Sequence, residues 1–341
     1  MKQVPEVLVP AERTAELIPL LLARGIADPE ARITAYAGGR RVPVRPERQA
    51  DAAAMGLTVV TGPAYSEASR PPLERIKELL QELTPAELDR LPEKWETAGS
   101  AVTLKLDPVL VEHGAAVGRA YAAVLGAKAV MADISGVAGE FRLPDMQVLY
   151  GVPGESVKTE NGIHYCFDPT AVMFASGNIN ERRRMGELDC RGETVVDMFA
   201  GIGYFTLPLA KFAGPRRLFA CEKNPRSYES LCKNLKLNGV ADTVIPILAD
   251  NRSLLGTGFA DRILMGYVQK TAEFLPTALR LAKSGCVIHY HDTFYVGQQE
   301  MRVREIFDAA CGKRLYEVLA IREVKSFAPS VSHYVADVKV G

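Results

Sequence analysis

The sequence of 341 residues has no long hydrophobic run and no excess of charge of either sign. No apolar segment approaches the roughly 20 residues that a membrane-spanning helix needs. The N-terminus also lacks the basic segment followed by an apolar core that marks a secretory signal. Because the formal net charge is zero, composition alone gives no support for nucleic-acid binding. These absences predict a cytoplasmic protein without membrane association.

Cysteine is scarce, with six residues and no Cys-x-x-Cys pair. Scattered cysteines are typical of reduced, mostly buried thiols in a cytosolic protein. The missing pair argues against a structural zinc site, so we expect no bound metal. With 48% hydrophobic and 24% charged residues, the chain otherwise has the composition of an ordinary globular protein.

The chain is long enough for more than one domain, each with a core of its own. Residues 1–70 show no clear pattern, and we leave their fold without a prediction. Residues 71–165 mix helical and strand-like spacing, which predicts a small α+β module. Residues 166–341 form the third part, a cofactor-binding catalytic domain.

From residue 166 onward, short apolar runs alternate regularly with amphipathic segments. Strands are expected near 194–200, 217–222, 244–250, 260–268 and 286–292, with helices near 204–213, 225–238, 270–284 and 298–310. Two more strands are expected at 314–322 and 333–340. Such alternation predicts an α/β fold with a mostly parallel sheet that helices cover on both faces.

The most informative segment follows the first of these strands. The strand ends in Asp197, and Gly201 and Gly203 precede a helical pattern. Glycines at this point let the backbone approach a ligand closely, and the helix N-terminus offers free N–H groups. A dinucleotide fingerprint would need a small residue where Thr206 stands. Taken alone, the motif also fits an ordinary strand–helix turn.

Two further strands end in carboxylates, Glu222 and Asp250, and Asn251 follows the second. Ligands of parallel sheets bind beyond the carboxyl ends of the strands. The ordered set therefore predicts an S-adenosylmethionine (SAM) pocket in a Rossmann-like methyltransferase fold of seven strands. Glu222 is expected to accept hydrogen bonds from the ribose hydroxyls, and Asp250 and Asn251 to read the adenine edge, with Asp250 accepting the exocyclic amine. The remaining cofactor contacts are assigned to Asp197, Ala200, Gly201 and Gly203.

Several segments around this motif resemble two related families that modify position 37 of tRNA, beside the anticodon. They are Thr159–Gly162, Asp168, Phe174–Asn178 and Glu181–Met185, with the upstream segment Gly139–Pro144. One family is the tRNA guanine-37 N1-methyltransferases. The other is the wybutosine-synthesizing aminocarboxypropyltransferases, which use SAM to alkylate C7 of 4-demethylwyosine in tRNA(Phe). The resemblance covers residues 90–341.

Two segments separate these families. After the fourth strand the methyltransferases have Asn-Leu-Pro or Asn-Pro-Pro, whereas this chain has Leu264–Val268, Leu-Met-Gly-Tyr-Val. Ser176–Asn178, Ser-Gly-Asn, stands in place of their Ser-Pro-Arg-like segment. Both resemble the aminocarboxypropyl group, which implies transfer of the 3-amino-3-carboxypropyl group of SAM and release of methylthioadenosine. A guanine-37 methyltransferase remains the alternative.

The resemblance also assigns roles to single residues. Ser176 and Arg183 would reach the cofactor, and the planar fork of Arg183 suits the methionine carboxylate. Arg182 is expected to contact the substrate, although a run of arginines also fits a solvated helix face. Tyr267 stands where related enzymes hold the substrate base, so we expect it to stack on that base. Core packing explains Tyr267 equally well.

Alkylation of C7 leaves a proton to be removed. His291 and Asp292 end the fifth expected strand and are candidate bases. His289 shares a strand face with His291, and we interpret it as a structural histidine. Transfer of the proton to water is the alternative.

The residues alone give no independent support for a tRNA partner, because the basic residues are spread along the chain. The substrate prediction therefore depends on the resemblance, while the SAM prediction depends on resemblance and spacing together. A non-catalytic RNA-binding protein and a small-molecule methyltransferase stay open, since a fold does not fix a substrate. The oligomeric state is not predicted.

Overall fold

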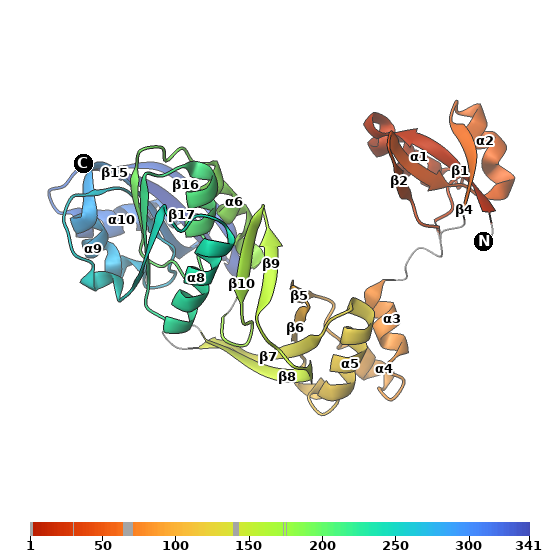
Figure 1. Cartoon of the computed structure of the whole chain (residues 1–341), viewed down its shortest axis with the longest axis horizontal. Helices are drawn as coiled ribbons and strands as arrows, with labels where there is room; N and C mark the ends of the chain where they lie inside the picture. The colour runs from red at the N-terminus through yellow and green to blue at the C-terminus, as the bar shows by residue number, and fades with distance from the viewer. Residues whose placement is uncertain (1–2, 30, 64–70, 139–142, 173, 175) are drawn as a thin grey trace. The chain divides into compact units, whose positions relative to one another are not determined.

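The computed structural model describes the chain except for residues 1–2, 30, 64–70, 139–142, 173 and 175. Its internal contacts divide the chain into two compact units, Met1–Leu88 and Asp89–Gly341 (Figure 1). Among the described residues, no helix is both long and apolar enough to cross a membrane. Part of the segment Gly139–Pro144, which contributes to the resemblance, lies outside the described residues.

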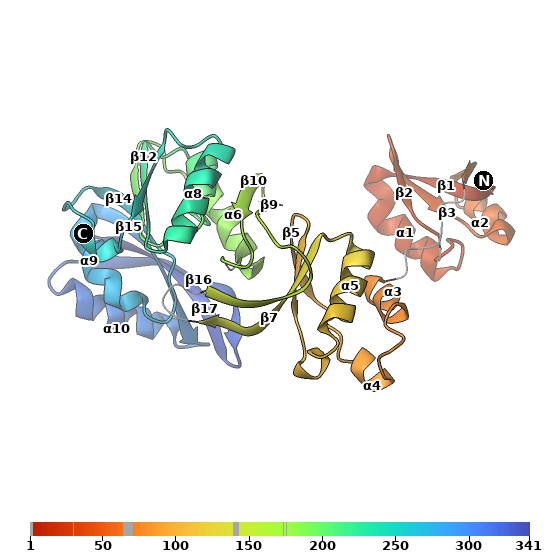
Figure 2. The same ribbon diagram turned by 60° about the horizontal axis from the view of Figure 1, so that its bottom comes forward.

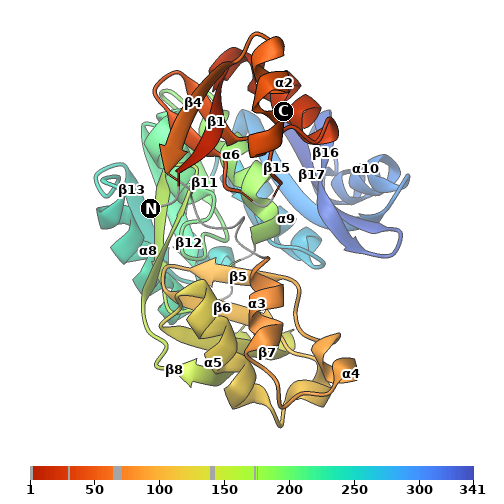
Figure 3. The same cartoon turned by 90° about the vertical axis from the view of Figure 1, so that its right-hand side faces the viewer.

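The first unit contains a four-stranded antiparallel sheet with the strand order β2-β3-β1-β4. Figure 3 labels two of these strands, β1 and β4. Its elements are β1 (Gln3–Pro10), α1 (Thr14–Ala23), β2 (Thr34–Tyr36), β3 (Gly39–Pro43), α2 (Gln49–Ala54) and β4 (Thr58–Pro63). Alternation along β1 turns Val7 and Val9 to one face, where they share a core with Leu17 and Leu21 of α1. The described part of residues 1–70, for which the sequence pattern gives no fold prediction, is therefore an α+β structure.

Two short helices follow, α3 (Pro72–Glu78) and α4 (Pro85–Leu88). The Thr84 N–H donates to Glu87 Oε2 at 2.8 Å, and the Glu87 N–H donates to Thr84 Oγ1 at 3.4 Å. This reciprocal pair is a capping box, which satisfies two N–H groups that a helix start leaves without partners.

A small module opens the second unit (Figure 2). Its four-stranded sheet has the order β5-β6-β7-β8, made by β5 (Trp95–Ala98), β6 (Ala101–Lys105), β7 (Ala129–Ala138) and β8 (Leu143–Gly151). The helix α5 (Gly114–Leu125) connects the parallel pair β6 and β7. Gly118 lets this helix approach the sheet, because a Cβ there would lie 2.7 Å from the Leu149 side chain.

The hairpin of β9 (Ser156–Glu160) and β10 (Ile163–Phe167) leads into the catalytic part. Asn161 and Gly162 form its turn with φ values of 50° and 76°, the left-handed conformation that two-residue hairpin turns favour. Two asparagines of α8 (Pro225–Leu237) and its C-cap accept hydrogen bonds from the free edge of β10. Asn234 Oδ1 accepts from Cys166 N at 2.7 Å, and Asn238 Oδ1 accepts from His164 N at 2.9 Å.

The large sheet has seven strands within the described residues, in the order β13-β12-β11-β14-β15-β17-β16. They are β11 (Thr194–Asp197), β12 (Arg217–Glu222), β13 (Val244–Leu248), β14 (Ala260–Met265), β15 (Ala282–Tyr295), β16 (Tyr316–Ala328) and β17 (Val331–Val340). The first five strands in the sheet order are parallel, whereas β17 runs antiparallel to both β15 and β16. This confirms the predicted mostly parallel sheet, with the C-terminal strand pair at one edge.

Helices cover both faces of this sheet, as predicted. The helices are α6 (Ile179–Glu187), α7 (Thr206–Pro208), α8, α9 (Leu275–Leu281) and α10 (Gln299–Cys311). On β11, Val195 packs in one core with Leu231 of α8, while Val196 packs in the opposite core with Phe307 of α10. Successive residues of β11 thus pack against helices on opposite faces of the sheet. Because both faces are buried, the strand does not alternate between apolar and polar residues.

The helix predicted for residues 270–284 is wrong at both ends. A 3₁₀ turn occupies Thr271–Phe274, α9 ends at Leu281, and Ala282 already belongs to β15. The Arg314 guanidinium donates to the carbonyl oxygens of Leu279 at 2.5 Å and Ala282 at 3.0 Å. A side chain distant in sequence thus satisfies carbonyls that an ending helix leaves without partners, which local spacing could not indicate.

Candidate functional site

A cavity of about 460 Å³ opens at the carboxyl ends of the parallel strands. Its volume lies in the range of small-molecule and cofactor sites. Eight of the residues predicted for the site line it: Ser176, Arg182, Gly201, Glu222, Asp250, Asn251, Tyr267 and His291. The cavity therefore lies where the sequence predicted a ligand site, at the edge where the acidic strand ends meet.

The glycine turn is fixed from behind by Asp197. This fully buried carboxylate accepts hydrogen bonds from Thr206 Oγ1 at 2.7 Å and from Phe199 N at 3.1 Å. Burial raises the pKa of Asp197 to about 6. Thr206, at the position where a dinucleotide fingerprint has a small residue, is therefore needed as the hydroxyl partner of Asp197.

Of the four residues assigned to the turn, Gly201 is the one that lines the cavity. Asp197 and Ala200 are buried behind it. Gly201 has φ 56° and Gly203 has φ 102°, and a Cβ on Gly203 would lie 2.7 Å from Leu207 Cγ. The two glycines thus allow a backbone conformation that side chains would oppose, and they present the Gly201 backbone to the cavity.

Glu222 ends β12 with its carboxylate held in place by the backbone. Oε2 accepts from Gly201 N and Oε1 accepts from Asn224 N, each at 2.7 Å. Burial raises the pKa of Glu222 above its usual value. Each carboxylate oxygen can accept a further hydrogen bond, so this group can receive a vicinal diol from the cavity.

Asp250 and Asn251 follow β13 and differ in how far protein groups satisfy their hydrogen bonds. Asp250 is already neutralised: Arg252 donates to both of its oxygens and Lys223 Nζ lies 3.1 Å from Oδ2. The Arg252 guanidinium accordingly holds the pKa of Asp250 well below its usual range. Asn251 donates through Nδ2 to Met198 O at 2.9 Å, but its buried Oδ1 has no hydrogen-bond partner among the described residues. Asn251 Oδ1 is therefore a buried acceptor that could receive a hydrogen bond from a ligand in the cavity.

Aromatic side chains build one wall. Tyr267 stacks on Phe199 with ring centroids 5.0 Å apart, and Phe274 meets both rings edge-on. All three line the cavity, so Tyr267 is a packing residue and a cavity residue together. Gly266 before it is required sterically, because a Cβ there would lie 2.8 Å from the Phe205 ring.

Asp292 does not line the cavity. Its Oδ1 accepts from the backbone N–H groups of Gln269 and Thr293, each at 2.8 Å, and its Oδ2 accepts from the Tyr290 hydroxyl at 2.8 Å. Gln269 has φ 75°, so the carboxylate holds a strained turn after β14 in position. Asp292, a candidate base in the sequence analysis, therefore stabilises the turn after β14 and does not face the cavity.

The structure separates the two arginines of α6 that the sequence offered. Arg182 is 2% exposed, forms a bidentate pair with Glu160 at 2.5 and 2.8 Å, and lies over the Phe174 ring. Arg183 is 69% exposed and pairs with Glu187 at 2.9 Å along the outer face of the helix. The fold brings Arg182 to the cavity and leaves Arg183 outside it.

Ser176 lines the cavity, and its hydroxyl donates to Glu96 of β5. Lys158 of β9 lies 3.3 Å from the same carboxylate. The small module therefore contacts the catalytic part at the site itself.

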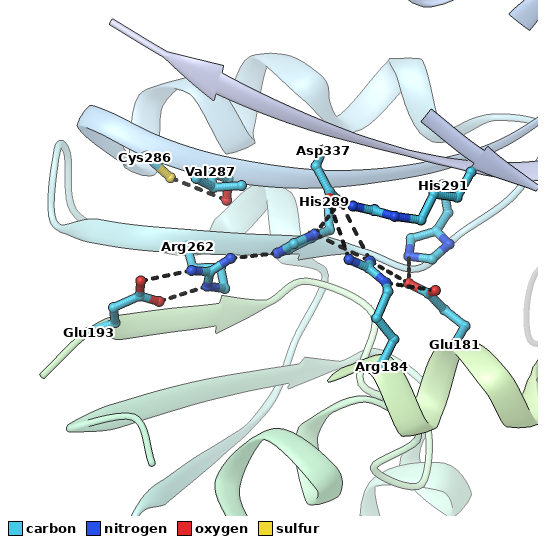
Figure 4. Close-up of polar contacts among 10 residues, drawn as sticks. Glu181, Arg184, Glu193, Arg262, Cys286, Val287, His289, His291 and Asp337 are labelled. Carbon is cyan, nitrogen blue, oxygen red and sulfur yellow. Dashed lines mark hydrogen bonds and ion pairs between the residues drawn. The ribbon is translucent and has the colours of Figure 1, made fainter. Parts of the chain in front are cut away.

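His289 and His291 lie on one face of β15, as predicted from their alternation (Figure 4). His289 is fully satisfied, with Nδ1 2.6 Å from Asp337 Oδ1 and Nε2 2.8 Å from an Arg262 nitrogen. His291 lines the cavity and stacks on Phe205 at 5.1 Å. Burial first, and then the neighbouring His289 and Arg184, lower the pKa of His291 to about 3. His291 is therefore uncharged near neutral pH.

Sequence reasoning missed several lining residues: Phe174, Phe199, Phe274, Lys325, Phe327 and His333. The last three come from β16 and β17, which run antiparallel at the sheet edge. The spacing predicted these strands, but no local signal indicates which of their residues face a pocket.

Comparison with known proteins identifies the chain. Residues 156–319 match the TRM5/TYW2 methyltransferase domain, and residues 76–154 match the TYW2 N-terminal domain. The chain is 40% identical over 274 residues to the tRNA(Phe) (4-demethylwyosine(37)-C(7)) aminocarboxypropyltransferase of Pyrococcus horikoshii, covering 78% of this chain and 96% of the relative. The chain belongs to the TRM5/TYW2 family.

Other members of the TRM5/TYW2 family are similar in sequence or structure. The Methanocaldococcus jannaschii aminocarboxypropyltransferase of the same name is 43% identical over 62% of this chain and 86% of its own. The crystal structure of P. horikoshii TYW2 in complex with MeSAdo has a TM-score of 0.70 and 38% identity over 79% of this chain and 98% of its own. Wild-type Trm5b from Pyrococcus abyssi has a TM-score of 0.72 and 30% identity over 99% of both chains. The fold is thus the SAM-dependent fold of this family, as predicted.

Proposed function

We propose that this protein transfers the 3-amino-3-carboxypropyl group of SAM to C7 of 4-demethylwyosine at position 37 of tRNA(Phe), beside the anticodon, and releases methylthioadenosine. The observation that carries this conclusion is the correspondence over 96% of a relative that bears the name of this activity. Gly266 and Tyr267 in the wall of the cavity agree with it, because the guanine-37 methyltransferases resembled here have Asn-Pro-type segments at this place. We expect the reaction to occur in the cytoplasm.

The residues of the cavity fit SAM. Glu222 is placed to accept the ribose hydroxyls, since both of its oxygens are fixed and can accept further bonds. The adenine amine is assigned to Asn251 Oδ1, the buried acceptor without a protein partner, whereas Asp250 is occupied by Arg252 and Lys223. The Gly201 backbone lies beside Glu222, to which its N–H donates. The sequence pattern assigned the adenine amine to Asp250, and we now assign it to the neighbouring residue Asn251.

When bound, SAM supplies a sulfonium whose attached carbons are electrophilic, and the carbon presented to the acceptor decides the product. The chain's own contribution is orientation, which can be worth about 7–11 kcal/mol in favourable cases. The Tyr267–Phe199 stack offers a flat surface for a splayed tricyclic base. Arg182 and Ser176 also line the cavity, where Glu160 and Glu96 hold their side chains. Arg183, on the outside of α6, is available to tRNA phosphate rather than to the methionine carboxylate.

The three-part division of the chain is kept as a proposal. Residues 166–341 would hold the cofactor, residues 71–165 supply Glu96 and Lys158 beside Ser176, and the described part of residues 1–70 has a sheet of its own.

The by-product of the reaction tests the function. Purified protein is incubated with SAM and tRNA(Phe) that carries 4-demethylwyosine, and the adenosine by-product is identified by mass spectrometry. Methylthioadenosine together with a heavier base is expected. S-adenosylhomocysteine, or reaction with tRNA that carries guanosine at position 37, would instead assign the methyltransferase activity.

A further inference from the structure

The start of α6 has the residues for mutual capping, but the structure does not form it. Asn178 is the N-cap residue and Glu181 stands three positions further on, where each side chain can accept from a backbone N–H group near the other. Asn178 makes no side-chain hydrogen bond to the helix. The two oxygens of Glu181 instead accept from Arg184, at 2.9 and 2.6 Å (Figure 4). The stability of the helix start therefore does not explain Asn178.

The side-chain oxygen of Asn178 is a buried polar atom without a hydrogen-bond partner. Among the described residues that line the cavity, three have such an atom: Asn178 Oδ1, Asn251 Oδ1 and His291 Nε2. Asn251 is assigned to the adenine amine, and His291 Nε2 lies 3.7 Å from the Glu181 carboxylate. A buried acceptor without a donor destabilises the protein, and a ligand that donates to it removes that penalty. Asn178 is thus a candidate ligand contact.

The donors of SAM indicate which group Asn178 receives. SAM carries three groups that donate hydrogen bonds, namely the adenine amine, the ribose hydroxyls and the α-ammonium group of its methionine part. The first two are assigned to Asn251 and Glu222, which follow β13 and end β12. Asn178 belongs to a different element, the start of α6, and offers an oxygen that can only accept. The α-ammonium group is the donor that remains for it.

We propose that Asn178 Oδ1 accepts a hydrogen bond from the α-ammonium group of SAM and so fixes the methionine end of the cofactor. The proposal rests on the placement of SAM given for the proposed function. Two charged neighbours of Asn178 on α6 are paired with protein groups, Glu181 with Arg184 and Arg182 with Glu160. The neutral amide is therefore an acceptor that the helix start leaves for the ligand. Contacts at the adenosine and at the ammonium hold between them the chain that contains Cγ, the carbon to be transferred.

Calorimetric titration with three ligands tests this contact without tRNA. SAM carries the ammonium and the carboxylate, decarboxylated SAM carries the ammonium alone, and methylthioadenosine carries neither. Asn178→Leu removes the acceptor and keeps the branched shape of the side chain. Affinity for SAM and for decarboxylated SAM should fall by about 10- to 150-fold, the range for loss of a hydrogen bond to a charged group. Affinity for methylthioadenosine should stay within about twofold of wild type.

Asn180→Leu is the matched control, because Asn180 is exposed on the same helix and is not among the residues that line the cavity. This variant should bind all three ligands as the wild type does. Asn178→Asp keeps an oxygen and adds a negative charge, so it should bind decarboxylated SAM more tightly than the wild type. Without ligand, Asn178→Leu and Asn180→Leu should unfold at similar urea concentrations, since Asn178 does not cap the helix.

A loss of affinity for SAM alone would assign Asn178 to the carboxylate and overturn the proposal. Unchanged affinity for SAM, or an equal loss for all three ligands, would overturn it as well. If Asn178→Leu does not fold, Asn178→Ala takes its place, and failure of both variants to fold would assign Asn178 to structure. These outcomes leave the transferase function to the by-product of the wild-type reaction, whereas a wild-type protein that does not bind SAM would overturn both.

Discussion

Replacing Glu222 by alanine tests the cofactor site at its best-defined point. Its carboxylate accepts two backbone N–H groups, from Gly201 and Asn224, and faces the cavity with its remaining lone pairs. Hydrogen bonds to a charged group contribute about 1.5–3 kcal/mol. Loss of the ribose contact should therefore weaken SAM binding by about 10- to 150-fold, since each 1.4 kcal/mol is tenfold.

The same substitution has a second effect that can be measured without ligand. It removes the acceptor of two N–H groups in the glycine turn, and each buried group left without a partner costs about 1–3 kcal/mol. Glu222→Gln keeps one oxygen and should lie between the wild type and Glu222→Ala in both SAM affinity and stability. Glu229→Ala, an exposed carboxylate on the neighbouring helix α8, is the control.

Calorimetric titration measures the affinities for SAM and for adenosine, and urea unfolding measures the free energy of unfolding. Both ligands should lose affinity by a similar factor, because the contact is to the ribose that they share. SAM affinity within twofold of wild type in Glu222→Ala would refute the placement of the ribose and the reasoning from the strand ends.

Three further predictions follow from the surroundings of the cavity. Arg183→Ala should change SAM affinity less than twofold. Arg182→Ala should lower the free energy of unfolding by about 3–5 kcal/mol, because it leaves the buried Glu160 charge without its partner. Equal effects of the two substitutions in SAM titration and in urea unfolding would contradict the different roles given to the two arginines. Asn234→Leu should cost about 2–4 kcal/mol in urea unfolding, since Cys166 N and Ile202 O both lose a partner; an unchanged stability would show that the hairpin does not need this contact. Because the pKa of His291 is lowered to about 3, the unfolded chain binds more protons below pH 6.5, and stability falls with falling pH. His291→Asn should remove about 2 kcal/mol of the loss between pH 6.5 and 5, and identical urea curves at both pH values would rule out a buried neutral ring.

Local spacing predicted the part of the site that lies on consecutive strand ends. Asp197, Glu222 and Asp250 each terminate an apolar run, and parallel strands with crossover helices bring such ends to one edge. The position of the cavity could therefore be predicted from the sequence. The division of labour among these residues could not, since it depends on hydrogen bonds across the turn. The Asp197 carboxylate accepts a hydrogen bond from Thr206, and the Asp250 carboxylate accepts one from Arg252.

Long-range contacts decided the rest. The spacing around α6 offered Arg182 and Arg183 as neighbours in sequence, and the direction in which the helix packs sends one into the cavity and the other to solvent. Arg314 ends α9 from more than thirty residues away.

The sequence by itself determined the alternation of strands and helices, the glycine turn and the acidic strand ends, because each of these depends on residues a few positions apart. Only the tertiary structure decided which residues of the two antiparallel edge strands face the ligand. The register between β15 and β17 sets His333 beside His291, and nothing in either strand's own pattern fixes that register. It arises from the packing of one face of the sheet against α6 and of the other against α9 and α10.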